Sequence, residues 1–207
     1  MTPKANTFKV GSTVKSPKKK DMKEDTYTSS ILQKRYNTFI TCRMETKAII
    51  EETGLPIRLP NPPEDITENI IKFIIQNKEK DKSCKWAKAL GKPGDLYSDL
   101  YTIPPEAKSF TSDGPSSFGP NKKFGVLYFL DMRNLERDHY ILWKLPLTHE
   151  SKEWKTLRMN SKKNQTHEDQ CNEGRRPHIS WDNIYCQLHH TAIKIYEGTF
   201  EGIFTEP

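Results

Sequence analysis

Long apolar segments are missing from this chain of 207 residues, in which only 34% of residues are hydrophobic. The longest clean apolar run is VLYFL at 126–130, whereas a membrane-spanning helix needs about 20 apolar residues. No segment reads as a signal peptide. Cysteine is also scarce, with four residues, which indicates a reducing cytosol and no disulfide framework. These absences predict a soluble cytoplasmic protein that does not bind membranes.

Positive charge is concentrated near the start of the chain. Residues 1–23 contain seven lysines and one acid, Asp21, which accounts for the whole net charge of +6. With few apolar anchors, residues 1–25 read as a flexible basic arm ahead of a single domain over 26–207. The arm is either an electrostatic contact to nucleic acid or a solvated tail.

The spacing of apolar residues predicts a mixed α and β fold. A helix is expected from Tyr27 to Thr53, ended by Gly54, and a second from Asp65, where Asp65 and Glu68 resemble a capping box. The later segments predict strands at 124–131 and 139–147 joined as a hairpin, a short helix at 151–159, a loop at 160–178, a helix from Ser180 and a closing strand at 193–204. This order belongs to the α/β (α+β) class.

One stretch, PGDLYSDLYTIPPEAKSF at 93–110, combines two acids and a lysine. Asp95 lies eleven residues before Glu106, a distance that lets two antiparallel strands bring the carboxylates together. Glu106 and Lys108, two apart on a strand, would point to the same face. A solvated surface ion pair is the alternative, because acid-x-lysine also occurs at Asp21–Lys23, Glu45–Lys47, Glu150–Lys152 and Glu153–Lys155.

This set of residues has the chemistry of a magnesium site. A hard cation such as Mg²⁺ binds carboxylate, carbonyl and water oxygens. Asp95 and Glu106 would hold the ion, and the backbone carbonyl of Ala107 would complete the site. The metal would polarise a phosphate and lower the pKa of an attacking water, which Lys108 would orient. The stretch therefore predicts metal-dependent cleavage of a phosphodiester bond.

The stretch and the following TSDGPSSFGPNKKFGVLYFLD resemble the PD-(D/E)xK nuclease superfamily, and within it the type II restriction endonucleases. The segment THEDQCNEGRRPHISWDNIYCQL is similar to a block found in such enzymes from microbes and large DNA viruses. The resemblance covers roughly residues 55–204. It implies a restriction-endonuclease-like core, a central mixed β-sheet flanked by helices. It also implies Asp95 and Glu106 as metal ligands, Lys108 as the catalytic lysine and Glu68 as a further helical acid.

Two prolines depart from the pattern of that superfamily. Pro104 and Pro105 directly precede Glu106, and proline cannot donate to a strand ladder. Either the catalytic strand begins at Glu106, or a bulge lies there. Asp99 could then compete with Asp95 for the metal.

Two polar segments are candidates for DNA contacts. The loop after the predicted catalytic strand offers hydroxyls suited to phosphate oxygens, at Ser109, Thr111, Ser112, Ser116 and Ser117. The segment EGRRPHIS supplies Arg175, Arg176 and His178, and arginine is the residue that reads guanine in the major groove. The alternatives are an ordinary Ser/Gly/Pro loop and an arginine pair bonded to Asp169, Glu173 or backbone carbonyls.

A zinc site is a further alternative. His167, Cys171, Cys186 and His189 approach zinc-finger spacing. However, Cys186 falls within the helix predicted from Ser180, where a small buried cysteine is routine.

These patterns predict a homodimeric, Mg²⁺-dependent type II restriction endonuclease of microbial or viral origin. It would cut double-stranded DNA at a short palindrome, leave 5′-phosphate ends and have a cognate DNA methyltransferase in the same system. The alternatives are a DNA-binding module without catalytic activity, held together by zinc, and a structure-specific repair nuclease of the same superfamily.

Overall fold

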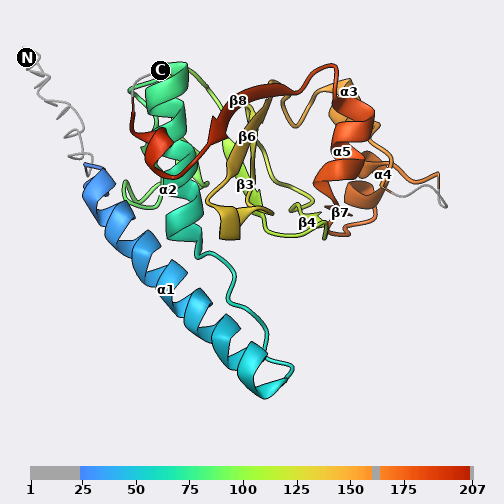
Figure 1. Ribbon diagram of the computed structural model, residues 1–207. Helices are drawn as coiled ribbons and strands as arrows, with labels where there is room; N and C mark the ends of the chain where they lie inside the picture. Colours follow the sequence, from blue (N-terminus) through green and yellow to red (C-terminus); the bar gives the residue numbers. More distant parts are fainter. Residues whose placement is uncertain (1–23, 160–163, 206–207) are drawn as a thin grey trace, which may run out of the picture.

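The centre of the protein is a four-stranded mixed sheet, seen in a computed structural model that describes residues 24–159 and 164–205 (Figure 1). The strand order is β3 (Glu106–Phe110), β5 (Leu127–Asp131), β6 (Tyr140–Leu145) and β8 (Ile193–Gly198). β3 runs parallel to β5, whereas the β5–β6 and β6–β8 pairs are antiparallel. The predicted hairpin over 124–147 is confirmed as β5 and β6.

Helices cover both faces of this sheet. All five residues of β5 are buried, and successive residues point to opposite faces. Tyr128 and Leu130 belong to one apolar cluster with α1 (Ser29–Thr53) and α2 (Glu64–Ile74). Leu127 and Phe129 belong to a second cluster, with α3 (Lys152–Lys155) and α5 (Trp181–Leu188). The expected architecture, a mixed sheet flanked by helices, is confirmed.

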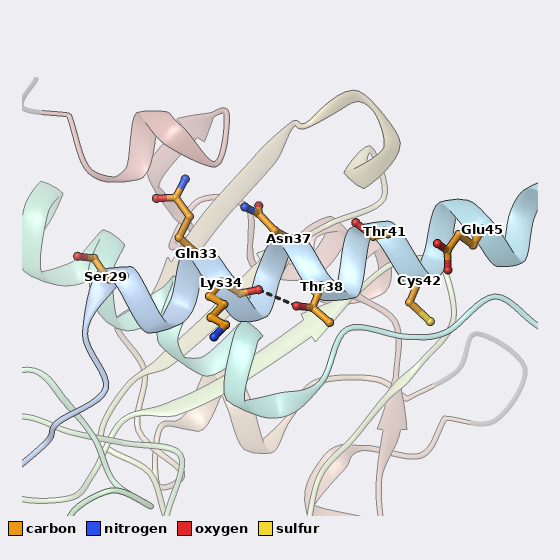
Figure 2. Close-up of a pocket in the computed structure, with 9 residues that line it drawn as sticks. Ser29, Gln33, Lys34, Asn37, Thr38, Thr41, Cys42 and Glu45 are labelled. Carbon is orange, nitrogen blue, oxygen red and sulfur yellow. Dashed lines mark hydrogen bonds between the residues drawn. The ribbon is translucent and has the colours of Figure 1, made fainter.

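The first helix follows its sequence signals. The hydroxyl of Thr28 accepts a hydrogen bond from the N–H of Ile31 at the start of α1, and Gly54 ends the helix with a left-handed φ of 66°. Only Leu32, Tyr36 and Phe39 of α1 are buried, and its C-terminal half projects from the body (Figure 1). Figure 2 shows a row of uncharged polar side chains along this helix, including Gln33, Asn37 and Thr41.

The start of α2 differs from the prediction. Its N-cap residue is Pro63, and no side chain caps the helix. The capping box of Asp65 and Glu68 is therefore wrong, because each carboxylate has another partner. Asp65 accepts hydrogen bonds from Tyr27 and Arg35, and Glu68 accepts one from the indole of Trp86. A π-helical turn, Ile75–Glu79, continues α2.

The later segments match the prediction in part. The helix predicted at 151–159 is shorter in the structure and comprises only α3. The closing strand predicted at 193–204 ends at Gly198 and is followed by a 3₁₀ turn, Glu201–Ile203. The predicted loop at 160–178 contains a helix, α4 (His167–Asn172). The helix from Ser180 is confirmed as α5, whose first turn is capped by the Ser180 hydroxyl.

Two short antiparallel pairs complete the fold, β1 (Lys85–Trp86) with β2 (Leu96–Tyr97) and β4 (Ser116–Ser117) with β7 (His178–Ile179).

Most of the basic arm, residues 1–23, lies outside the described residues. Asp25, the last residue assigned to it, has a buried carboxylate 3.1 Å from the ammonium of Lys72. The same carboxylate accepts a hydrogen bond from the N–H of Trp86. The chain is thus anchored at Asp25. Within the described ranges, no helix is both long and apolar enough to cross a membrane.

Candidate active site

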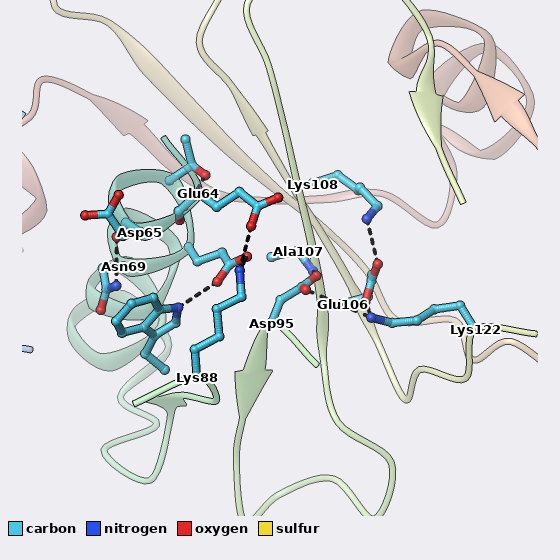
Figure 3. A network of polar contacts seen from close by, with 12 residues as sticks. Glu64, Asp65, Asn69, Lys88, Asp95, Glu106, Ala107, Lys108 and Lys122 are labelled. Carbon is cyan, nitrogen blue, oxygen red and sulfur yellow. Dashed lines mark hydrogen bonds and ion pairs between the residues drawn. The ribbon is translucent and has the colours of Figure 1, made fainter. Parts of the chain in front are cut away.

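The edge of β3 brings Asp95 and Glu106 together. Asp95 directly precedes β2, and its Oδ2 accepts a hydrogen bond of 3.0 Å from the N–H of Ala107 (Figure 3). The expected antiparallel pairing of the two segments is wrong, because β2 pairs with β1 and β3 pairs with β5. The carboxylate of Asp95, hydrogen-bonded to the edge of β3, takes the place of the expected pairing between the two segments. Asp99 is exposed and accepts a hydrogen bond from Tyr97, so Asp95 is the acid beside Glu106.

The two prolines place Glu106 at the first position of β3. The strand begins directly after Pro105, and the N–H of Glu106 donates to the carbonyl of Val126 at 3.0 Å. Because N–H and C=O groups alternate sides along a strand, both backbone groups of Ala107 point away from β5. The Ala107 carbonyl therefore faces the same open edge as Asp95.

Two lysines contact the Glu106 carboxylate, which is only 3% exposed. Lys108 Nζ lies 2.6 Å from Oε1, and Lys122 Nζ lies 2.7 Å from Oε2 (Figure 3). The Lys122 ammonium also lies 3.9 Å from Asp95 Oδ1. Sequence reasoning missed Lys122, because it lies sixteen residues after Glu106 in a polar loop and the Asp95, Glu106 and Lys108 pattern does not include it.

Glu68 lies on the α2 side of the same region. Its carboxylate accepts hydrogen bonds from Trp86 Nε1 at 2.6 Å and from Lys88 Nζ at 3.1 Å. A cavity of about 200 Å³ connects this side chain with β3, lined by Glu64, Thr67, Glu68, Ile71, Asp95, Ala107, Lys108 and Ser109. The expected site residues Glu68, Asp95, Ala107 and Lys108 thus share one cavity.

The electrostatics of the site oppose ionisation of its buried acids Glu106 and Glu68, of which only Glu68 lines the cavity. Burial raises the pKa of Glu106, the charge of Lys108 lowers it, and the charge of Asp95 raises it further. Burial also raises the pKa of Glu68, against the hydrogen bond from Trp86. Burial alone would lower the pKa of Lys122, but its contact with Glu106 raises it. The carboxylates therefore repel each other and are stabilised by the ammonium groups.

The oxygen atoms at the edge of β3 fit a Mg²⁺ ion. Glu106 Oε2 is buried without a well-aligned hydrogen bond, although the Lys122 ammonium is close. Asp95 Oδ1 and the Ala107 carbonyl complete a set of hard oxygen donors. Among the described residues, no group of three or more His, Cys, Asp or Glu side chains forms a metal site. Mg²⁺ needs only one or two carboxylates, since it keeps several waters and binds substrate phosphates.

A polar groove continues from this cavity. A second cavity of about 390 Å³ is lined by Arg58, Asn61 and Pro62 of the connector and, facing them, by residues 109–112 and 114–116. Ser109 lines both cavities. The predicted contacts Ser109, Thr111, Ser112 and Ser116 thus lie along one path. The Ser117 hydroxyl is buried, with no hydrogen bond to a described residue, so it does not line this groove.

The two predicted DNA-contact segments are neighbours in space. Ser116 and Ser117 pair with Ile179 and His178 in the β4–β7 ladder, and the N–H of Phe118 donates to the carbonyl of Pro177. Arg175, Arg176 and His178 are exposed. Arg175 Nε lies 3.1 Å from Glu173, whereas Arg176 has no ion pair with any residue that the structure describes.

The four zinc candidates do not form one cluster. His167 Nδ1 lies 3.6 Å from Cys171 Sγ, but Cys186 is exposed on α5. Within residues 24–159 and 164–205, these four side chains do not form a metal-binding group. His167 instead packs in the core, with its ring centroid 5.0 Å from that of Trp154.

Comparison with known proteins places this chain in a family. The model of the Bsp6I restriction endonuclease family matches residues 28–187, a span from α1 through β3 and the β4–β7 pair to α5. No curated protein and no solved structure matches the chain. The match covers most of the chain and agrees with the expected resemblance to type II restriction endonucleases. The chain therefore belongs to the Bsp6I restriction endonuclease family.

Proposed function

We propose that this protein is a Mg²⁺-dependent type II restriction endonuclease whose cleavage centre is formed by Asp95, Glu106 and Lys108. The observation that carries the proposal is the contact of Asp95 with the β3 edge beside Glu106, in a chain of this family. Asp95, Glu106 and the Ala107 carbonyl would hold the ion, with Glu68 as a further carboxylate near the cavity. When bound, Mg²⁺ supplies a water of lowered pKa and polarises the phosphate.

The residues of the chain then divide the remaining tasks. The Lys108 ammonium, 2.6 Å from Glu106, orients the attacking water and offsets negative charge on the phosphate. The groove from Ser109 to Ser116, with Arg58 on its other wall, holds the backbone of the cleaved strand through hydroxyl and guanidinium groups. Arg175, Arg176 and His178 contact base edges. The product ends are 5′-phosphate and 3′-hydroxyl.

The proposal includes a homodimer and a short palindromic site, because a two-fold symmetric enzyme reads both strands in the same way. A cognate DNA methyltransferase would protect the host DNA at the same sequence. The alternative of a repair nuclease predicts cleavage that follows DNA structure instead of sequence.

The test is cleavage of a plasmid of known sequence in Mg²⁺, followed by sequencing of the fragment ends. We expect fragments that end at one short palindrome with 5′-phosphates. Asp95→Ala, Glu106→Ala and Lys108→Ala should each reduce cleavage by about a hundredfold or more, while cognate binding in Ca²⁺ persists. Asp99→Ala is the matched control and should cleave normally. Loss of activity in Asp99→Ala, with full activity in Asp95→Ala, would show that the assigned acid is wrong.

A further inference from the structure

Lys122 occupies an unusual place between the two proposed metal ligands. Its ammonium lies 2.7 Å from Glu106 Oε2 and 3.9 Å from Asp95 Oδ1. The other oxygen of each carboxylate has a different partner. Ala107 N–H donates to Asp95 Oδ2, and Lys108 donates to Glu106 Oε1. The two oxygens left over are those that share Lys122, as Figure 3 shows from its side chain reaching toward Glu106.

The loop that carries Lys122 is fixed at both sides of it. The N–H of Lys122 donates to the carbonyl of Gly119, and Phe124 is buried. The N–H of Gly125 donates to the carbonyl of Pro104. A Cβ at Gly125 would lie 2.3 Å from the carbonyl oxygen of Ile103, so only glycine lets the chain pass this close. The backbone therefore holds Lys122 near the start of β3.

The side chain of Lys122 retains a path to solvent. It is 34% exposed, whereas the Glu106 carboxylate that it contacts is buried. A flexible lysine stem can move its ammonium outward while the backbone stays in place. A cation bound by Asp95 Oδ1 and Glu106 Oε2 would occupy the region of the ammonium, and two positive charges this close repel strongly.

We infer that Lys122 is a tethered cation that holds Asp95 and Glu106 together in the metal-free protein and that a divalent metal displaces. The inference rests on the proposed function, because it takes the same two carboxylates as metal ligands. Lys122 is a positioning residue in this scheme, since it acts through the two carboxylates. Metal binding then replaces the Lys122 ammonium by the divalent cation, and this competition lowers the affinity of the two carboxylates for the metal.

The first test is calorimetric titration of the full-length protein with Ca²⁺ alone, without DNA. Lys122→Met removes the competing charge and should lower the Kd for Ca²⁺ by about tenfold or more. Lys122→Arg keeps the charge and should bind Ca²⁺ as the wild type does. The matched control is Lys123→Met, because Lys123 is adjacent, exposed and without an ion pair to a described residue. Its Kd should change by less than about threefold, since charges in solvent are screened. An equal effect of Lys122→Met and Lys123→Met would overturn the inference.

The second test follows the position of the ammonium directly. An amine-acylating reagent should modify Lys122 slowly in metal-free protein and several-fold faster in saturating Ca²⁺, measured by peptide mass spectrometry. The rate at Lys123 should not change. If Mg²⁺-dependent cleavage is found but Ca²⁺ leaves the Lys122 rate unchanged, the inference is wrong and the proposed function stands. If the wild type binds no Ca²⁺, the inference fails, and the cleavage assay decides the function separately.

Discussion

His167 is a buried imidazole in the α4 side of the core. It is 9% exposed, its ring packs on Trp154 and Phe118, and its Nε2 has no hydrogen bond to a described residue. Burial lowers its pKa to about 4, because a charged imidazolium would lose its hydration. A histidine chosen from the sequence as a zinc candidate is thus a neutral core residue.

The lowered pKa of His167 predicts acid sensitivity. Below its ordinary pKa of about 6.5 the unfolded chain takes up a proton, whereas the folded protein does so only near pH 4. The free energy of unfolding should therefore fall as pH decreases from about 6.5 to 4, by about 3 kcal/mol at most from this residue. Urea denaturation of the wild type and His167→Phe at pH 7.5 and pH 5 measures this. The variant should lose less stability on acidification, and equal losses in both proteins would contradict the prediction.

Single residues also show how far the sequence predicts the candidate site. The sequence predicted that Asp95 lies near Glu106, but through an antiparallel pairing that does not form, and the two prolines left a strand start at Glu106 as one of two alternatives. The contact that joins them, a carboxylate to the N–H of Ala107, was not predictable, because no local pattern marks a side chain that binds a strand edge. Lys122 was not predictable for the same reason, since only tertiary packing brings its loop to β3.

At the level of elements, α5 was predictable from its cap and its apolar stripe, and the short helix α4 was not predicted. α5 has the Ser180 cap and buries Trp181, Ile184 and Leu188. In α4, His167 is the one buried residue, so the hydrophobic pattern gave no signal. Its capping box of Thr166 and Asp169 was the available sign. The parallel pairing of β3 with β5 was also missed, because strands close in sequence usually form antiparallel hairpins.

The close approach of two segments at Gly125 predicts a sharp contrast between two glycines. Gly125→Ala would place its Cβ 2.3 Å from the Ile103 carbonyl and force apart the chains entering β3 and β5. We expect a loss of about 1–3 kcal/mol of stability, with reduced cleavage. Gly119→Ala, whose nearest neighbour is Lys122 Cβ at 3.5 Å, is the control and should change stability by less than about 0.5 kcal/mol. Thermal denaturation of both variants tests this, and similar melting temperatures would contradict it.

The β4–β7 pair predicts unequal roles for the two adjacent arginines. Arg175 already contacts Glu173, whereas Arg176 has no ion pair within the described ranges and is exposed. We expect Arg176→Ala to reduce cleavage of the cognate site by about tenfold to a hundredfold, since one arginine–guanine contact contributes about 1–3 kcal/mol of discrimination. Binding to random DNA should change little. Arg175→Ala should have the smaller effect. A uniform loss on cognate and random DNA would instead indicate a phosphate contact.

At the scale of the whole molecule, the net charge and the described fold lie in different parts of the chain. The net charge of +6 resides in residues 1–23, and the rest of the chain is neutral. The buried ion pair of Asp25 and Lys72 follows these charged residues and involves the last residue of the predicted arm. The mixed sheet flanked by helices and the family match confirm the expected restriction-endonuclease-like fold. The single domain over 26–207 and the role of the arm stay predictions.

Removal of residues 1–23 should leave folding and the choice of cleavage site intact. Binding should weaken and depend less on salt, because the slope of log K against log salt falls by about 0.9 for each phosphate that the arm no longer neutralises. The measurement is DNA binding in Ca²⁺ at salt concentrations from about 50 to 200 mM, compared with a full-length variant in which the seven arm lysines are glutamine. The truncated protein and the glutamine variant should show the same weakened binding and the same reduced salt dependence. An unchanged slope would show that the arm is a solvated tail.

The β4–β7 pair joins two loops that are about sixty residues apart in the chain, and neither strand belongs to the central sheet. The surface proposed to read the DNA therefore has its own small ladder, which packs on the central sheet through Phe118 and Ile179, buried in the same apolar cluster as Phe129. Substitutions of the exposed residues of these two segments, such as Arg175, Arg176 and His178, would not touch the backbone hydrogen bonds between β3 and β5. Under the proposed assignment of roles, substitutions at the exposed positions of both segments would alter the preferred target, and the residues proposed to cleave the DNA would be inherited unchanged.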